Sequence, residues 1–208
     1  MRVFGFVQAG GGSTRFGTDK ALVELGGKTL LARTVELVAS VCEETRVVAA
    51  AGKYGDARVP IVVDKWPGQG PLGGILTALD FSNEKFRVAG GEGACALIVS
   101  CDMPFLTGEW LAYLCERAVK STACVVVPES ENGLEPLCAC WRTEAVGAIQ
   151  VAFDGGVRKV TEAMKRLSME VLDESAWKRF DSGGRLFWNM NTLADYEEAR
   201  RVIEERAG

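Results

Sequence analysis

Histidine is absent from this 208-residue sequence, and its seven cysteines include no Cys-x-x-Cys pair. A Ser-His-Asp or Cys-His catalytic site is therefore excluded, and no histidine is available to complete a zinc site with the cysteines. The cysteines lie in or beside apolar runs, which predicts buried thiols in a reducing compartment. Any catalysis must then depend on carboxylates, lysine, arginine or a bound metal ion.

Long apolar stretches are also absent. No run reaches the roughly 18 residues that cross a membrane, and Gly5 and the glycine-rich stretch after it interrupt the N-terminal apolar run too early for a signal peptide. Hydrophobic residues make up 48% of the chain and charged residues 25%, which is typical of a soluble globular protein. The composition predicts a single cytoplasmic domain over residues 1–208, with no membrane partner.

Positive charge is scarce overall but gathers at the N-terminus. The net charge is −4, which argues against nucleic acid as a partner. Residues 1–33 hold five basic and two acidic residues, a net charge of +3, so the rest of the chain carries −7. This distribution favours a small, strongly anionic ligand near the N-terminus.

Strand-like and helix-like segments alternate along the chain, which predicts an α/β fold with a mostly parallel sheet covered on both faces. Two neighbouring strands with no helix between them, 123–127 and 136–141, predict one antiparallel strand, so the sheet is mixed. Residues 83–94 are expected to form an exposed loop. The other predicted strands are 3–8, 46–51, 61–63, 94–100 and 169–172, and the predicted helices are 29–41, one starting at 71, 107–120, 143–151, 157–167 and 193–207.

The segment after the first strand has the chemistry of a phosphate-binding loop. Gly10, Gly11 and Gly12 leave backbone N–H groups free to approach phosphate oxygens. Arg15 and Lys20 add positive charge nearby, and hydroxyl groups such as that of Ser13 add hydrogen-bond donors. The alternative is an ordinary glycine-rich turn, but the two cations favour phosphate binding.

Two common nucleotide-binding motifs do not fit this segment. The dinucleotide fingerprint Gly-x-Gly-x-x-Gly fails because Arg15 stands at the third glycine position. The P-loop motif, tested on the Gly-Lys-Thr triplet at 27–29, fails because its first glycine position is occupied by Leu22.

A longer pattern, Ala-Gly-Gly-x-Ser-x-Arg-hydrophobic-Gly-x-Asp-Lys-Ala-Leu over residues 9–22, resembles nucleotidyltransferases of the molybdenum cofactor guanylyltransferase family. The resemblance extends from Val7 to about Tyr196. It implies a three-layer α/β/α Rossmann-like nucleotidyltransferase domain. It also implies an activity, the transfer of GMP from GTP to the phosphate of molybdopterin with release of pyrophosphate. The family's partners would be these two substrates and, transiently, proteins that supply or accept the cofactor.

Asp102 follows the apolar run 94–100, and ligands of parallel sheets bind outside the carboxyl ends of strands. A carboxylate at this place can hold Mg²⁺ together with phosphate oxygens, or it can simply start a turn before Pro104. The resemblance implies the metal site, with Mg²⁺ as the cofactor and Mn²⁺ as its alternative. It also implies that Arg15, Lys20 and Asp102 are the catalytic residues.

A second acidic residue, Asp64, ends the run 61–63 and precedes a Pro/Gly-rich segment that opens a helix. Backbone N–H groups there can meet a nucleotide, or the segment is an ordinary loop. The resemblance favours nucleotide contact. The nucleotide-binding residues it implies are Gln8, Ala9, Gly10, Gly11, Gly12, Ser13, Lys20, Asp64, Pro71, Leu72, Gly73 and Asp102.

The second substrate is assigned to two later segments. Asn189 and Asn191 lie two positions apart and so project to the same side of an extended chain, where their amides can meet phosphate or pterin edges. Asparagine also favours turns, and the resemblance favours the binding role. It adds Glu135 and Pro136 to the second-substrate side.

The sequence departs from the family pattern at Gln8, where leucine is usual, and at 49–51, where the family commonly has asparagine. Both places bear on the choice of base. One alternative is therefore a nucleotidyltransferase that uses CTP or acts on another phosphorylated acceptor, such as a sugar 1-phosphate. A non-catalytic nucleotide-binding protein is the other.

Overall fold

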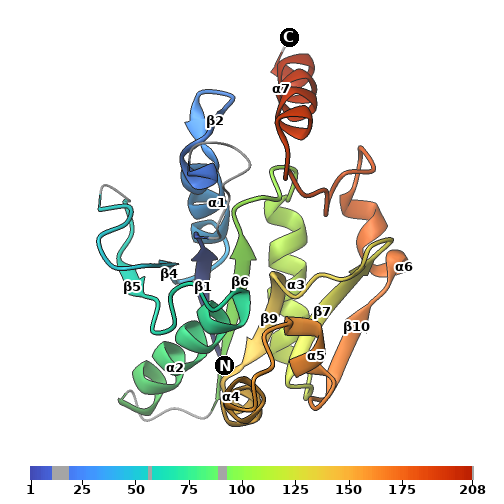
Figure 1. The fold of residues 1–208 in the computed structure, drawn as a ribbon. Coiled ribbons are helices and arrows are strands. Elements are labelled where there is room, and N and C mark those ends of the chain that lie inside the picture. Colours follow the sequence, from blue (N-terminus) through green and yellow to red (C-terminus); the bar gives the residue numbers. More distant parts are fainter. Residues whose placement is uncertain (11–18, 56–57, 89–92, 208) are drawn as a thin grey trace.

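The computed structural model describes residues 1–10, 19–55, 58–88 and 93–207. Within these ranges, one eight-stranded sheet has the order β10-β7-β9-β6-β1-β4-β5, with β8 paired to β7 (Figure 1). Antiparallel pairing joins β9 to β6 and to β7, whereas β1, β4, β5 and β6 run parallel, as do β7 and β10. The mixed, mostly parallel α/β sheet predicted from the sequence is therefore confirmed. Its strands are β1 (Arg2–Gln8), β4 (Glu44–Ala49), β5 (Ile61–Val63), β6 (Ala94–Ser100), β7 (Val125–Ser130), β8 (Gly133–Leu134), β9 (Cys138–Arg142) and β10 (Met169–Leu172).

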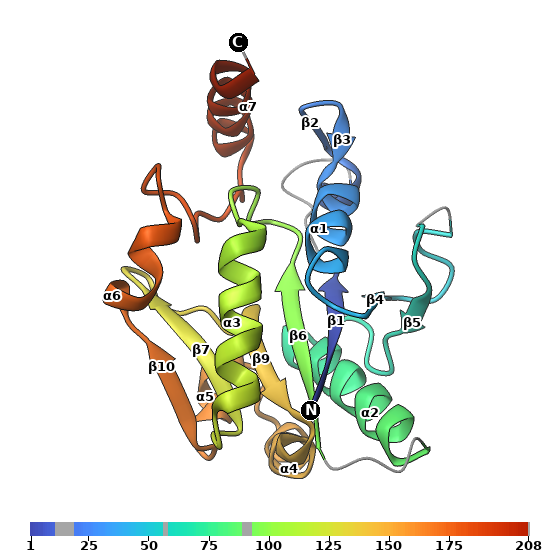
Figure 2. The same cartoon turned by 180° about the vertical axis from the view of Figure 1, so that it is seen from behind.

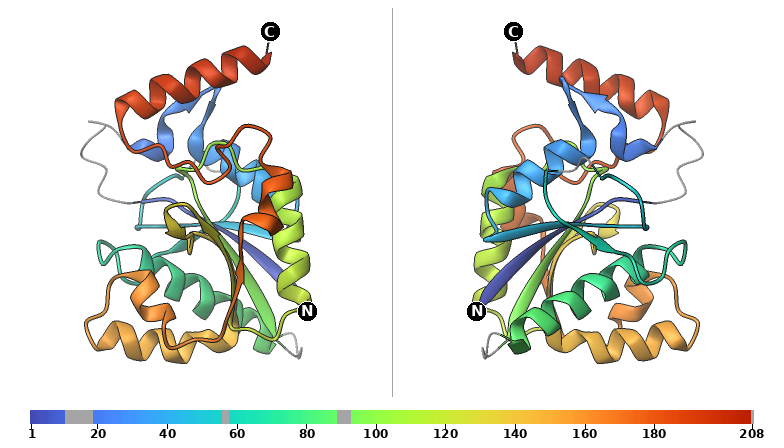
Figure 3. Two further views of the ribbon diagram at one scale, coloured as in Figure 1. Left: turned by 90° about the vertical axis from the view of Figure 1, so that its right-hand side faces the viewer. Right: turned by 90° about the vertical axis from the view of Figure 1, so that its left-hand side faces the viewer.

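Helices cover both faces of the sheet and produce three layers (Figures 2 and 3). One face packs against α1 and α3, and the opposite face packs against α2, α4 and α5, so that each face has its own hydrophobic cluster. The α7 helix lies beyond the carboxyl ends of the strands, next to a short β2–β3 hairpin. The helices are α1 (Leu30–Ala39), α2 (Pro71–Val88), α3 (Gly108–Lys120), α4 (Val146–Asp154), α5 (Val160–Met164), α6 (Glu174–Trp177) and α7 (Leu193–Ala207), and the hairpin strands are β2 (Glu24–Leu25) and β3 (Lys28–Thr29).

The central strand β6 shows why the sequence folds in this way. Its side chains alternate between the two hydrophobic clusters, so Leu97 and Ile98 point to opposite faces and both are buried. A continuous apolar run is what a parallel strand covered on both faces requires. The same alternation places Cys138 and Cys140 on one face of β9, as predicted. All seven cysteines are free thiols; five of them are buried, as predicted, whereas Cys42 and Cys124 are only partly buried.

Two parts of the predicted secondary structure were wrong. Residues 83–88 belong to α2 rather than to an exposed loop, because Phe86 packs against the core and the polar residues around it occupy the solvent face of the helix. The β2–β3 hairpin and α6 were not predicted, since two- and four-residue elements carry no clear periodicity.

Among the described residues, no helix combines the length and the apolar character that a membrane span needs.

Candidate active site

The site lies at the edge of the sheet where the parallel strands β1, β4 and β6 end. In the register of these strands, Gln8 stands beside Val48 of β4 and Ser100 of β6. Segments that follow the three strands therefore meet at one edge. Open α/β sheets bind their ligands at this kind of edge.

Three residues that are distant in the sequence meet there. The Nζ atom of Lys20 lies 3.3 Å from Oδ2 of Asp102 and 3.1 Å from Oδ1 of Asn191. Lys20 belongs to a short 3₁₀ helix (Lys20–Leu22), Asp102 follows β6, and Asn191 precedes α7. The backbone N–H of Met190 also donates to the carbonyl oxygen of Asp102, at 2.8 Å. The C-terminal segment is thereby attached to the end of β6.

Asp102 has an oxygen that fits a metal ion. Its Oδ1 atom is buried and has no hydrogen-bond partner among the described residues. An unpartnered buried carboxylate oxygen is costly unless a cation or a donor meets it. The described part of the chain contains no group of three carboxylate, cysteine or histidine ligands. Such a site suits Mg²⁺, which is usually bound by one or two carboxylates and completed by substrate phosphates and water.

The residues assigned to the second substrate occupy the same region without forming one cluster. The pKa of the Glu135 carboxyl lies above its ordinary value, mainly because the group is buried. The hydrogen bond from Ser130 Oγ, at 2.6 Å, lowers this pKa, and the negative charge of Asp102 raises it. The carbonyl of Pro136 accepts from Trp141 Nε1 at 3.3 Å. The side chain of Asn189 donates to its own segment, at the carbonyl of Phe187, whereas Asn191 contacts Lys20.

Gln8 and Asp64, two residues of the predicted nucleotide set, lie beside the first turn of α2. Gln8 Nε2 donates to the carbonyl of Pro71 at 3.1 Å, and Gln8 Oε1 is buried without a partner among the described residues. Asp64 Oδ1 accepts from the backbone N–H of Trp66 and from the Thr77 hydroxyl, so this carboxylate also holds the turn between β5 and α2.

Other members of the predicted nucleotide set differ in what they expose. The side chain of Leu72 is fully buried, which leaves only its backbone for a ligand. Ala9 is also buried, Gly73 packs against Trp66, and Gly10 is exposed with φ of +122°. The predictions for Gly11, Gly12, Ser13 and Arg15 lie outside the described residues.

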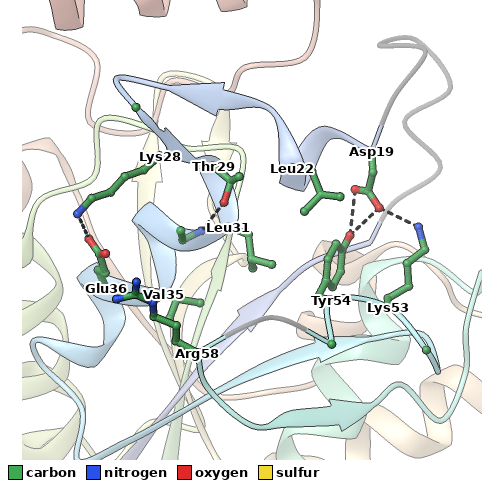
Figure 4. Close-up of a pocket in the computed structure, with 14 residues that line it drawn as sticks. Asp19, Leu22, Lys28, Thr29, Leu31, Val35, Glu36, Lys53, Tyr54 and Arg58 are labelled. Atoms are coloured by element: carbon green, nitrogen blue, oxygen red, sulfur yellow. Dashed lines mark hydrogen bonds and ion pairs between the residues drawn. The ribbon is translucent and has the colours of Figure 1, made fainter.

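A polar cluster next to Lys20, formed by Asp19, Lys53 and Tyr54, was not predicted from the sequence. The Asp19 carboxylate accepts hydrogen bonds from Lys53 Nζ at 2.8 Å and from the Tyr54 hydroxyl at 2.9 Å (Figure 4). It also accepts from the backbone N–H of Ala21 at 3.2 Å. The cluster borders a pocket of about 960 Å³ that is lined by α1, by residues 52–55 and by Arg58. No sequence signal joins Asp19 to a tyrosine 35 positions away.

A mostly parallel sheet with a lysine and a carboxylate in contact at its strand ends places the chain among the α/β proteins that bind ligands at this edge. Residues 5–168 match the family described as MobA-like NTP transferase domain, and the chain belongs to this family. It is therefore a nucleotidyltransferase, and the enzyme class predicted from the sequence is confirmed.

Individual relatives agree with this assignment. The chain is 31% identical over 200 residues to a probable molybdenum cofactor guanylyltransferase of Chloroflexus aggregans, covering 94% of this chain and 92% of the relative. It is 29% identical to a molybdenum cofactor guanylyltransferase of Desulfosudis oleivorans, covering 97% and 96%. The crystal structure of molybdopterin-guanine dinucleotide biosynthesis protein A from Archaeoglobus fulgidus superimposes with a TM-score of 0.82 at 25% identity, covering 97% and 99%.

Proposed function

We propose that this nucleotidyltransferase acts in molybdenum cofactor biosynthesis and transfers GMP from GTP to the terminal phosphate of molybdopterin. The names of the relatives support the substrates. The observation that carries the proposal is the contact of Lys20 with Asp102 and Asn191. This contact joins the predicted phosphate loop, the predicted metal ligand and the predicted second-substrate side in one place.

In the proposed reaction, the molybdopterin phosphate attacks the α-phosphorus of GTP in line, and pyrophosphate leaves. The attacking phosphate needs no general base, because its second pKa is about 6 and it is already ionised at neutral pH. The chain's own residues then position the two substrates and neutralise charge. We assign the phosphates of the leaving group to Lys20, to Arg15 and to the backbone N–H groups of residues 10–12.

Asp102 is the residue that would hold the metal ion, through the Oδ1 atom that has no described partner. Mg²⁺ bound there would supply charge neutralisation for the phosphate oxygens, and Mn²⁺ is its proposed alternative. Lys20 approaches the other oxygen, Oδ2. One carboxylate can therefore orient the lysine and meet the cation at the same time.

The acceptor is assigned to the side of the site bordered by Glu135, Pro136, Asn189 and Asn191. The contact of Asn191 with Lys20 supports this assignment, because it places one of these residues beside the lysine proposed to bind phosphate. The nucleoside is assigned to the opposite side, along Gln8, Ala9, Asp64 and the first turn of α2.

The test is to incubate the purified protein with GTP, molybdopterin and Mg²⁺ and to measure both pyrophosphate and the dinucleotide product. We expect Asp102→Asn to lower the rate by about a hundredfold or more, since it removes charge at the reacting phosphates. Asp154→Asn, an exposed change on α4, is the matched control and should keep full activity.

Pyrophosphate release at the wild-type rate by the Asp102→Asn protein would contradict the assigned role of Asp102. A dinucleotide product formed from CTP but not from GTP would contradict the proposed base.

A further inference from the structure

Tyr54 has a backbone conformation that is unusual for a bulky residue. Its φ is +55°, and among the described residues it is the one non-glycine residue with a positive φ. Left-handed backbone is unfavourable in a residue of this kind and persists only where surrounding contacts impose it. Here the contact is identifiable, because the Tyr54 hydroxyl lies 2.9 Å from both carboxylate oxygens of Asp19.

Asp19 in turn fixes the short helix that carries Lys20. Its side chain accepts from the N–H of Ala21, and its carbonyl accepts from the N–H of Leu22 at 2.9 Å. A three-residue 3₁₀ helix has little stability of its own. The position of its backbone therefore depends on the groups that hold its capping residue.

The two ends of the Lys20 side chain are thus fixed by different parts of the protein. Asp102 and Asn191 hold the ammonium group, and the side chain of Lys20 is only 12% exposed. The capping residue Asp19 is held from the segment after β4, by Tyr54 and by Lys53 (Figure 4). Lys53 is 54% exposed, so its ion pair is screened by water and contributes less than the half-buried hydrogen bond of Tyr54.

We propose that Tyr54 is a positioning residue for phosphate transfer, which holds Lys20 against Asp102 by clamping Asp19. The inference rests on the proposed role of Lys20 at the phosphates. Tyr54 itself touches neither substrate in this scheme. Its strained backbone is the structural requirement for bringing the hydroxyl to Asp19.

The first test needs no substrate. Acetic anhydride acylates accessible lysines, and mass spectrometry of the digested protein measures each rate. In Tyr54→Phe, which removes only the hydroxyl, we expect the acylation of Lys20 to rise severalfold while that of the exposed Lys85 stays unchanged. Tyr113→Phe is the matched control. It removes the same hydroxyl group from a tyrosine of α3 whose ring packs against Trp110 and Phe180 rather than against the Asp19 cluster. A Lys20 acylation rate equal to that of the wild type would overturn the inference.

The second test separates positioning from folding. At a temperature at which circular dichroism shows both variants to be fully folded, kcat of Tyr54→Phe should fall about tenfold, and Lys53→Met should have a smaller effect. If Tyr54 has a purely structural role, Tyr54→Phe will have a lower melting temperature but an unchanged kcat and an unchanged Lys20 acylation rate. That result would refute the proposal that Tyr54 positions Lys20. A wild-type protein without transferase activity would instead refute the proposed function, while the acylation experiment would still decide the clamp.

Discussion

Three hydrogen-bond donors surround the carboxylate of Asp19 in the polar cluster next to Lys20: Lys53 Nζ, the Tyr54 hydroxyl and the backbone N–H of Ala21. Burial raises its pKa, but the hydrogen bonds from Lys53, Tyr54 and Ala21 outweigh burial, so the pKa of Asp19 lies below its ordinary value. The ionised form is then the one that folding favours. Its contribution to the free energy of unfolding is fully present above the unfolded-chain pKa of about 3.9 and is lost as the pH falls through the lower folded-state pKa.

This residue gives a prediction for pH dependence. Asp19→Asn should be less stable than the wild type at pH 7, and the difference in the free energy of unfolding should shrink as the pH falls below about 4. Urea denaturation at a series of pH values measures it. A difference that stays constant from pH 7 to pH 2 would mean that the charge of Asp19 is not what the cluster stabilises.

The sequence predicted those candidate site residues that stand inside a recognisable sequence pattern, and it did not predict contacts between distant segments. Lys20 and Asp102 each stand in a recognisable pattern next to a strand, and the structure brings them together. The contact between Lys20 and Asn191 joins residues 171 positions apart and was not predicted, because the resemblance assigned Lys20 to the nucleotide and Asn191 to the second substrate. Tyr54 was not predicted at all, because the sequence gives no sign of which segment packs against Asp19.

Among the elements, the packing of α1 on β1 is unusually close. Gly5 lies in the middle of β1, and a Cβ atom added there would lie 2.4 Å from Cγ1 of Val38 and 3.1 Å from Sγ of Cys42. Val38 is fully buried and has no room to move away. The absence of a side chain at Gly5 therefore sets the distance between the helix and the strand.

Gly5→Ala should accordingly destabilise the protein by about 1–3 kcal/mol through overpacking. Gly147→Ala is the matched control, because a Cβ atom at this position in α4 meets nothing within 4 Å. It should instead stabilise the protein by about 0.5–1 kcal/mol through helix propensity. Chemical denaturation measures both variants, and equal effects of the two substitutions would show that the close packing has no energetic consequence.

At this scale the sequence predicted the elements that carry a clear local signal, whatever their length. The ranges of β5, β6 and β10 agree with the predicted strands, and Thr107 caps α3 as expected, with its hydroxyl 3.2 Å from the N–H of Trp110. Their apolar runs and capping residues are local signals. The hairpin 24–29 lacks such a signal, and the C-terminal part of α2 is so polar that it resembles a loop.

The whole molecule should respond to its nucleotide, because a ligand that binds only the folded state stabilises it. GTP with Mg²⁺ at about a hundred times its dissociation constant adds about 2.7 kcal/mol, or about 5–10 °C in melting temperature for a chain of this size. Thermal unfolding with GTP, CTP and UTP measures the effect, and Asp102→Asn should lose most of it. A larger shift with CTP than with GTP would contradict the proposed guanine specificity.

That residues 1–208 fold as one domain stays a prediction.

The hydrogen bond between Met190 and Asp102, together with the contact between Asn191 and Lys20, also has a consequence for biosynthesis. The strands β1 and β6 leave the ribosome long before residue 191 is translated. A nascent chain can therefore assemble most of its sheet while the edge near Lys20 still lacks the segment that carries Asn191. Under the proposed function, chains that end before residue 191 lack this contact with Lys20 and should be inactive.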